Sequence, residues 1–173
     1  MLRRPQSAMN KATTHRFAFA GWLTAVLLLL GCNPQPEVSS DYRSVDATGW
    51  DDQRAVVFTT DSLPTSDTYA FTLALRTTTM HPYPYQDITL EVTEHWCLPG
   101  HRQRVQRDTL TIALYDHTGA PTVQHGVAYH EYWQPLAVRR LPRATTGIIA
   151  VRHLMNAITI SGISDIGIIT RRE

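Results

Sequence analysis

From Trp50 onward, apolar and polar residues alternate along the chain with a period of two. In YAFTLALR, residues 69–76, every second side chain is large and apolar, from Tyr69 to Leu75, and Arg76 falls on the other side. Successive side chains of a strand point to opposite faces of its sheet, so this pattern predicts a strand with one buried face. DITLEV and TLTIALY repeat the pattern, with the expected inward residues Ile88, Leu90, Val92, Leu110, Ile112 and Leu114.

Four further stretches have the composition of strands, namely RAVVFTT, VAYHEYW, GIIAVRH and DIGIITR. Glycine and proline mark the expected joints between strands, at Pro64, Pro82, Pro84, Pro99, Gly100, Gly119, Pro121, Pro135, Pro142 and Gly147. Only RHLMNAITI has room for a helical turn. The pattern therefore predicts an all-β fold over residues 49–173, an antiparallel β-sandwich of jelly-roll-like type.

The region before the strands begins with a different pattern. An apolar run from Phe17 to Leu30 holds 14 residues, which as a helix would cover about 21 Å. A bilayer core of about 30 Å is longer than that. The residues before this run include four bases, Arg3, Arg4, Lys11 and Arg16, and no acid. A basic segment followed by a short apolar run is typical of a secretory signal peptide, here residues 1–31.

The signal ends in Leu29, Leu30, Gly31 and Cys32, the arrangement of a bacterial lipoprotein cleavage site. We expect the Cys32 thiol to be joined to diacylglycerol and its amine to be acylated, an anchor of three chains that is effectively permanent. Residues 32–48 are polar and contain two prolines, so we expect a tether there. Asn33, not Asp, follows the cysteine, which in many Gram-negative sorting systems permits transfer to the outer membrane. We expect an outer-membrane location with the domain facing the periplasm.

Removing the signal changes the charge of the chain. The full sequence has 16 Lys and Arg against 15 Asp and Glu, and four of the bases precede Cys32. The remaining 142 residues would carry 12 bases, all arginine, and a formal charge of −3. Without basic runs, the chain has no electrostatic footprint for nucleic acid. With Cys32 acylated, Cys97 has no cysteine partner, so stability must come from packing.

Several motifs together resemble one bacterial family. They are YAFTLALRTTTMHPYPYQDITLEV, the late GISDIGI, the pair Gly49 and Trp50, and the lipoprotein signal. Over residues 42–172 the chain is similar to the gliding motility lipoprotein H family (GldH) of Bacteroidetes. The resemblance implies a membrane-anchored, non-enzymatic component of the gliding machinery, tied to type IX secretion, whose partners are other envelope proteins.

Within these motifs, five residues are candidates for structural or partner-docking roles: Arg76, Tyr83, Tyr85, Trp50 and Asp165. We expect Arg76 to stack on Tyr83 or Tyr85, or to pair with Asp87, and so to clamp the proline-rich corner. A partner-docking arginine is the alternative.

In GISDIGI, the two glycines are expected to bracket a turn into the last strand. Asp165 or Ser164 would bond backbone N–H groups there.

The stretch HWCLPGH offers the sharpest candidate chemistry. His95 and Cys97 lie two apart on an expected strand, hence on one face, and His101 follows the turn. A zinc ion would need further ligands from His125, His130 or Glu131, but the spacing matches no standard zinc pattern. A Cys97 nucleophile with a histidine base lacks an orienting third group. We therefore expect no metal, no cofactor and no enzymatic activity.

Aromatic residues support a rival function, the binding of glycans or other ligands on a β-sandwich. The set comprises Trp50, Tyr83, Tyr85, Trp96, Tyr129, Tyr132 and Trp133. Along YHEYW, Tyr129 and Trp133 share one face with Glu131, while Tyr132 falls on the other. Some of these rings must therefore belong to the core.

Overall fold

The computed structural model describes residues 38–123 and 128–173, which contain ten strands and no helix. The expected signal peptide, Cys32 and His125 lie outside the described residues. No helix that could cross a membrane is present in the part of the chain that is described. The strands are β1 Val38–Ser44, β2 Trp50–Asp51, β3 Val56–Thr60, β4 Asp67–Thr78, β5 Asp87–Leu98, β6 Arg102–Ala113, β7 Tyr129–Leu141, β8 Thr146–His153, β9 Thr159–Ile160 and β10 Ile163–Arg172.

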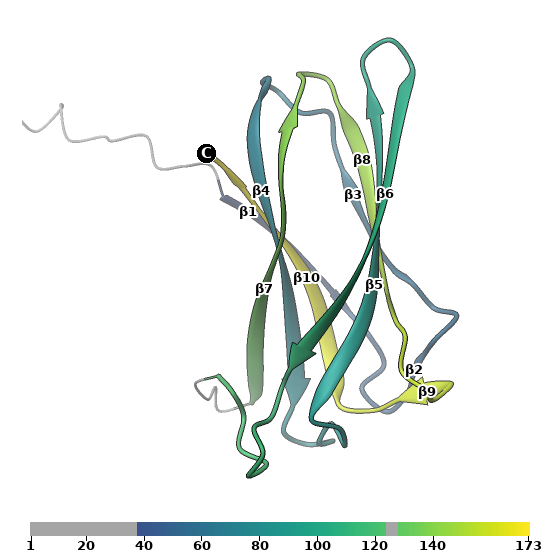
Figure 1. The fold of residues 1–173 in the computed structure, drawn as a ribbon, viewed down its shortest axis with the longest axis vertical. Helices are drawn as coiled ribbons and strands as arrows, with labels where there is room; N and C mark the ends of the chain where they lie inside the picture. The colour runs from purple at the N-terminus through teal and green to yellow at the C-terminus, as the bar shows by residue number, and fades with distance from the viewer. Residues whose placement is uncertain (1–37, 124–127) are drawn as a thin grey trace, which may run out of the picture. The chain divides into compact units, whose positions relative to one another are not determined.

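Two four-stranded antiparallel sheets pack face to face (Figure 1). The first sheet has the order β1-β10-β4-β7 and the second has the order β3-β8-β5-β6, while the short β2 and β9 pair separately. Of the connections between successive long strands, only the one from β5 to β6 stays within a sheet. This alternation is the jelly-roll arrangement. The predicted all-β sandwich is confirmed.

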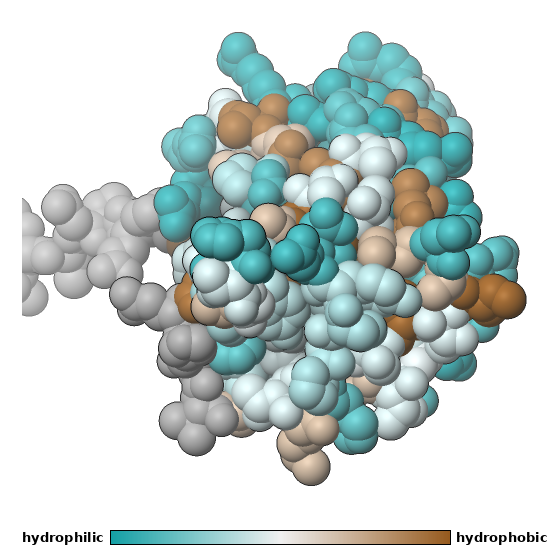
Figure 2. Space-filling model, turned by 60° about the horizontal axis from the view of Figure 1, so that its bottom comes forward, coloured by the Kyte–Doolittle hydropathy of each residue, from teal (hydrophilic) through white to brown (hydrophobic). Residues whose placement is uncertain are grey.

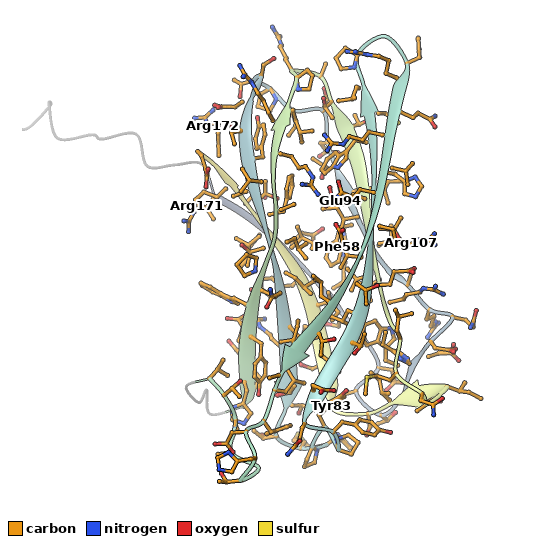
Figure 3. The ribbon with its side chains drawn as sticks, viewed as in Figure 1. Phe58, Tyr83, Glu94, Arg107, Arg171 and Arg172 are labelled. Carbon is orange, nitrogen blue, oxygen red and sulfur yellow. The ribbon has the colours of Figure 1, made fainter. Side chains whose placement is uncertain are left out.

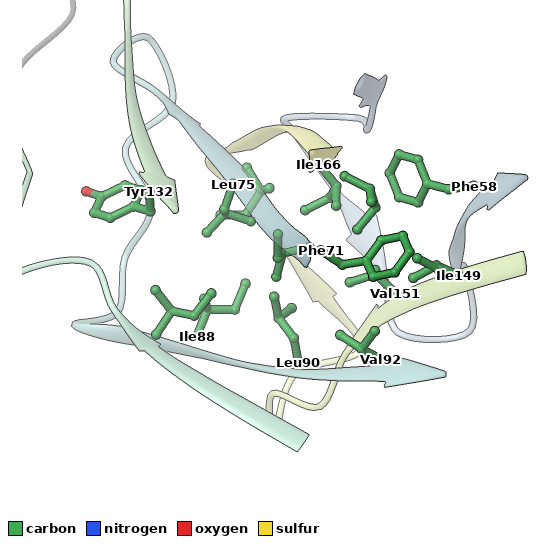
Figure 4. Close-up of a cluster of buried hydrophobic side chains, with 14 of the residues drawn as sticks. Phe58, Phe71, Leu75, Ile88, Leu90, Val92, Tyr132, Ile149, Val151 and Ile166 are labelled. Carbon is green, nitrogen blue, oxygen red and sulfur yellow. The ribbon is translucent and has the colours of Figure 1, made fainter. Parts of the chain in front are cut away.

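The core lies between the sheets and consists of the alternating positions read from the sequence. Phe71 and Leu75 of β4 face Leu90 and Val92 of β5 across this interface (Figure 4). The Phe71 and Trp96 rings have centroids 5.3 Å apart. Each fully buried Leu, Ile or Phe contributes roughly 1.5–3 kcal/mol. Apolar packing is therefore the main source of stability in the described domain, where Cys97 is free.

Strand β1 differs from the sequence prediction, which assigned residues 32–48 to a tether. Residues 38–44 pair with β10 in continuous antiparallel register, from Val38 opposite Arg171 to Ser44 opposite Asp165. The strand is polar and exposed or half-buried along its whole length, because it forms the edge of the first sheet. It carries no apolar alternation, so nothing in the sequence pattern distinguishes it from a linker. The folded domain thus begins at Val38 instead of Gly49.

Two of the expected joints lie inside strands. Pro135 is within β7, where the pairing with β4 shifts register between Phe71 and Thr72. An edge strand tolerates proline, because its outer N–H groups have no neighbour to bond. Gly147 is within β8 opposite Trp96, and a Cβ there would collide with the Trp96 indole. Its glycine makes room for a core ring and is not a turn residue.

A buried ion pair joins the two sheets. Glu94 continues the inward alternation of β5, and its carboxylate accepts hydrogen bonds from Arg139 Nε at 3.2 Å and Nη2 at 3.1 Å. The Trp96 indole donates a third bond to Glu94, at 2.8 Å. The side chains of Glu94 and Arg139 are 3 % and 14 % exposed. Because Arg139 belongs to β7, this pair connects opposite layers of the sandwich; Figure 3 labels Glu94 between them.

Arg139→Met should destabilise the domain by about 3–5 kcal/mol, because it leaves the Glu94 carboxylate buried without its cation. The measurement is the free energy of unfolding from denaturant titration. Arg140→Met is the matched control, since Arg140 is the exposed neighbour on the same strand, and it should change stability by less than about 0.5 kcal/mol.

The double variant Glu94→Leu with Arg139→Met should recover most of the lost stability, because no buried charge then remains unpaired. Equal stability of Arg139→Met and Arg140→Met would contradict the role given to the ion pair.

Candidate functional site

The outer face of the β1-β10-β4-β7 sheet carries a cluster of charged and aromatic residues around Arg76. The register places Arg76 of β4 beside Glu131 of β7. Arg76 Nε donates to Glu131 Oε1 at 2.9 Å, and the two side chains are about a quarter exposed. The guanidinium carbon lies 4.0 Å from the Tyr42 ring centroid and 4.6 Å from that of Tyr129. Arg76 is therefore held between two rings and a carboxylate.

Tyr42 reaches this cluster from the far edge of the same sheet. Its hydroxyl donates to Glu131 Oε1 at 2.8 Å, so it spans the two intervening strands, β10 and β4. The register aligns Tyr42 with Gly167 and Ala74, which have the smallest side chains on those strands. A Cβ on Gly167 would lie 2.6 Å from Tyr42 Cε1. The ring can cross the sheet only because position 167 is glycine.

The cluster has defined protonation states at neutral pH. Burial raises the pKa of Tyr42 to about 12, and the hydrogen bond and negative charge of Glu131 add to the rise. Burial by itself lowers the pKa of Arg76, but the hydrogen bond and charge of Glu131 outweigh it, so the pKa of Arg76 is raised. Tyr42 therefore remains a donor and Arg76 remains a cation.

The structure corrects the expected partners of Arg76. It stacks on Tyr42 and Tyr129 and pairs with Glu131, and does not clamp the proline-rich corner. Tyr83 is unsuited to stack on it, because the Tyr83 ring is buried in the core and its hydroxyl donates to the Asp87 carbonyl at 2.9 Å. Sequence reasoning missed Tyr42 because that residue was assigned to the tether.

Asp165 also differs from its expected role. It lies within β10, where its carboxylate accepts hydrogen bonds from the hydroxyls of Ser44 and Ser164, each at 2.8 Å. It thus joins β10 to β1 through side chains and does not bond backbone N–H groups in a turn. Of the two glycines expected to bracket that turn, only Gly162 does so, with φ +89°, because Gly167 is in mid-strand.

The remaining candidates, Tyr83, Tyr85 and Trp50, lie at the end of the sandwich that is lower in Figure 1. Tyr83 and Tyr85 make an edge contact with centroids 5.5 Å apart, and burial raises the pKa of Tyr83. Trp50 is buried, donates its indole N–H to the Arg54 carbonyl at 2.8 Å, and meets the His153 ring edge-on. The contacts of Tyr83 and Trp50 are structural, while Tyr85 remains partly exposed.

Two exposed aromatic side chains extend the Arg76 cluster. Trp133 is 63 % exposed and Tyr129 is 40 % exposed, and both stand on β7 on the same face as Glu131. Tyr132, on the opposite face, is buried, which confirms the division of rings expected from YHEYW. We call Tyr42, Arg76, Tyr129, Glu131 and Trp133 the aromatic–arginine face.

The histidine and cysteine candidates lie apart. His95 and Cys97 share the outer face of the second sheet, and both are exposed. His130 and Glu131 belong to the other sheet. Among residues 38–123 and 128–173, no three His, Cys, Asp or Glu side chains come close enough to hold a metal ion.

A cleft of about 370 Å³ opens where the edge strands β1 and β3 of the two sheets face each other. Buried apolar residues line its floor, including Phe58, Leu63 and Tyr69, and Asp41, Asp61 and Arg172 stand at its margin. Among the described residues that line it, none is a histidine or a cysteine. The cleft therefore offers apolar contact instead of a nucleophile paired with a base.

Comparison with known families identifies the fold's relatives. A family model described as GldH lipoprotein matches residues 37–169, which includes all of β1 to β9 and most of β10. The chain belongs to the GldH lipoprotein family. The resemblance drawn from the sequence motifs is thereby confirmed. A search of curated proteins finds no match.

Solved structures include distant likenesses to this GldH family chain. An infectious bursal disease virus structure (Gx strain) is 11 % identical with a TM-score of 0.35, covering 80 % of this chain, which spans 33 % of the viral chain. A xylan-binding domain of carbohydrate-binding module family 22 is 12 % identical with a TM-score of 0.36, covering 82 % of this chain and 89 % of its own. The C-terminal family 22 module of Clostridium thermocellum Xyn10B is 12 % identical with a TM-score of 0.35, and the match covers 82 % of this chain and 87 % of the module. Such values say nothing of what this chain binds.

Gly167→Ala should displace the Tyr42 ring and break its bond to Glu131, at a cost of about 1–3 kcal/mol in the free energy of unfolding. The pKa of Tyr42 should then move from about 12 toward the ordinary value of 10.0. Tyrosinate absorbance during alkaline titration measures this shift, with Tyr42→Phe marking which phenol is seen.

The same raised pKa predicts a pH effect. A group protonated more tightly in the folded state stabilises fully below its unfolded pKa, and this contribution is lost as pH rises through the folded pKa. Wild type should therefore lose stability faster than Tyr42→Phe from pH 10 toward pH 12. Identical slopes would contradict the contact.

Proposed function

We propose that this protein is a lipid-anchored, non-enzymatic component of the gliding motility and type IX secretion-associated machinery of the cell envelope. Its anchor would be the acylated Cys32, in the outer membrane with the domain facing the periplasm. The observation that carries the proposal is membership of the GldH lipoprotein family, whose model matches residues 37–169. The non-enzymatic role follows from what the family resemblance implies.

The aromatic–arginine face supports a role in assembly. Trp, Tyr and Arg are the residue types that contribute most to binding energy in protein interfaces, and here all three meet on one sheet face. Arg76 is already held in place by Glu131 and two rings, so little side-chain entropy would be lost on binding. Trp133 projects beside this rigid cluster. The face would serve as the docking surface for a protein partner.

The outer face of the second sheet has a different character. Its exposed apolar side chains are aliphatic, from Val57, Val105 and Ile148, without an exposed Phe, Tyr or Trp beside them. Single exposed aliphatic residues are normal on a protein surface. The two outer faces therefore provide an internal comparison for any docking experiment.

Glycan binding is the second candidate function, and one observation favours it. The Trp133 indole is the most exposed of the described tryptophans and stands beside an ion pair with polar atoms still accessible. An exposed ring next to such donors and acceptors is also a suitable surface for stacking a sugar. Protein docking and sugar stacking would then use the same residues.

Trp133→Ala should abolish co-purification of gliding or secretion proteins with the tagged protein from solubilised outer membranes, because an interface anchor of this type typically contributes at least about 2 kcal/mol, or roughly thirtyfold in affinity. Val105→Ala is the matched control, as a residue of comparable exposure on the opposite outer face, and should leave the partners bound.

Chromatography on glycan columns tests the second candidate function. Glycan binding would replace assembly as the proposed function if the protein is retained on such a column, the retention requires Trp133, and no envelope protein co-purifies. Loss of partners in Val105→Ala but not in Trp133→Ala would move the docking surface to the other sheet.

A further inference from the structure

The arginines are distributed unevenly over the domain. All twelve lie within the described residues, and six of them form ion pairs with carboxylates, at Arg43, Arg76, Arg107, Arg139, Arg152 and Arg172. Five of the other six are exposed at one end of the sandwich, namely Arg102, Arg104, Arg140, Arg143 and Arg171. Arg54 is elsewhere. The exposed positive charge that no ion pair compensates is thus concentrated at a single end.

This basic end is where the chain enters the fold. Val38, the first residue of β1, is opposite Arg171 of β10 in the sheet register. Arg140 is two positions before the turn 142–145 that carries Arg143, at the same end of the first sheet. Figure 3 labels Arg171 and Arg172 toward this end and Tyr83 at the opposite end. Arg102 and Arg104 follow the β5–β6 turn, which lies at this end of the second sheet.

The length of the preceding chain limits how far this end can lie from a lipid at Cys32. Val38 is six positions after Cys32, and an extended chain covers at most about 3.6 Å per residue, or roughly 20 Å in all. If Cys32 is held at the headgroups, the beginning of β1 stays within that distance of them. The arginine side chains extend from the domain toward the headgroups and shorten this distance. Electrostatic attraction between guanidinium groups and lipid phosphates then acts over a Debye length of about 8 Å.

The opposite end of the sandwich is acidic. Asp46, Asp51, Asp52, Asp87 and Asp116 lie there or in loops leading to it, with Arg54 as the arginine among them. Hydrogen bonds from Thr48 lower the pKa of Asp46, and those from Thr118 and Ala120 lower that of Asp116, so both stay ionised. Figure 2 brings this end forward and shows apolar residues scattered among hydrophilic ones. The domain is therefore polarised although its formal charge is small.

Acidic residues are also present at the basic end, but they are fewer. Asp67 is paired with Arg172 at 3.9 Å, and Asp61 and Glu173 stand nearby. With Glu94 already neutralised by Arg139, positive charge remains in excess there. The guanidinium groups of Arg140, Arg143 and Arg171 are free to meet phosphate oxygens, which they can bind in bidentate fashion.

We propose that the arginine-rich end of the sandwich binds the anionic phospholipid surface in which the Cys32 anchor is embedded. The inference rests on the anchoring part of the proposed function. Phosphodiester headgroups would meet Arg102, Arg104, Arg140, Arg143 and Arg171, and the strands would run away from the bilayer. The acidic end would face the aqueous compartment, and the aromatic–arginine face would stand upright, open to a partner from the side.

The test uses the mature chain from residue 32 with Cys32→Ser, which carries no lipid, and vesicles of phosphatidylcholine alone or with one third phosphatidylglycerol. Binding should require phosphatidylglycerol and weaken with added salt. Arg140→Gln, Arg143→Gln and Arg171→Gln together should lower the partition coefficient at least about tenfold, since each arginine near an anionic surface contributes about fivefold.

The matched control removes the same charge elsewhere, with Arg43→Gln, Arg54→Gln and Arg107→Gln, and should bind within about twofold of the parent chain. Equal binding to both vesicle compositions, or equal loss in the two triple variants, would overturn the proposal. Stronger binding to lipopolysaccharide than to phosphatidylglycerol would overturn it as well. Because this chain has no acyl group, the result does not depend on whether Cys32 is lipidated in the cell.

Orientation has its own readout. In the Cys32→Ser chain, Cys97 is the remaining cysteine, and it is exposed near the basic end, opposite Gln103. A fluorophore on Cys97 should be quenched by headgroup-attached quenchers in vesicles, whereas one on Thr118→Cys in a Cys97→Ser background should not. Stronger quenching at position 118 would show the acidic end on the membrane and would overturn the proposed orientation.

Discussion

The hydrogen bond from Tyr42 to Glu131 connects the edge strand β1 to the farthest strand of its sheet, and the aromatic–arginine face is built around it. Strand β1 buries little apolar surface, so few other side-chain contacts hold it. Its Tyr42 ring completes the stack around Arg76, and its first residue begins only six positions after Cys32. The same short strand therefore shapes the candidate docking face and would limit the distance between the domain and the proposed anchor at Cys32.

Charged groups play two different roles in this sandwich. Glu94 and Arg139 are buried between the sheets, where each charge requires the other, because either one left alone would be buried without a partner. Five of the six arginines without an ion pair lie at one end, where they are exposed and available to a ligand. The small net charge therefore hides an uneven distribution, with a basic end beside the beginning of β1, an acidic end opposite, and the aromatic–arginine face between them.

The sequence predicted the fold class well, because long strands such as β4 and β5 are buried on one side and alternate strictly. It failed for β1, since an edge strand exposed on both faces has no alternation to read. The partners of Arg76 depend on strand register across the sheet, which no local pattern reveals. The burial of Glu94 could have been predicted, because Glu94 occupies an inward position between Val92 and Trp96. The side of the sheet on which Arg139 lies could not, because a register shift in the pairing of β7 with β4 interrupts the alternation before it.

Cys32 is proposed to fix this domain to a membrane at short range, and fractionation of cells expressing the full chain tests this role most directly. Wild type should be in the membrane fraction, and Cys32→Ser should be released to the soluble fraction or accumulate as the uncleaved precursor. Cys97→Ser, which changes the other cysteine, should behave as wild type. Normal processing and unchanged membrane retention of Cys32→Ser would contradict the claim.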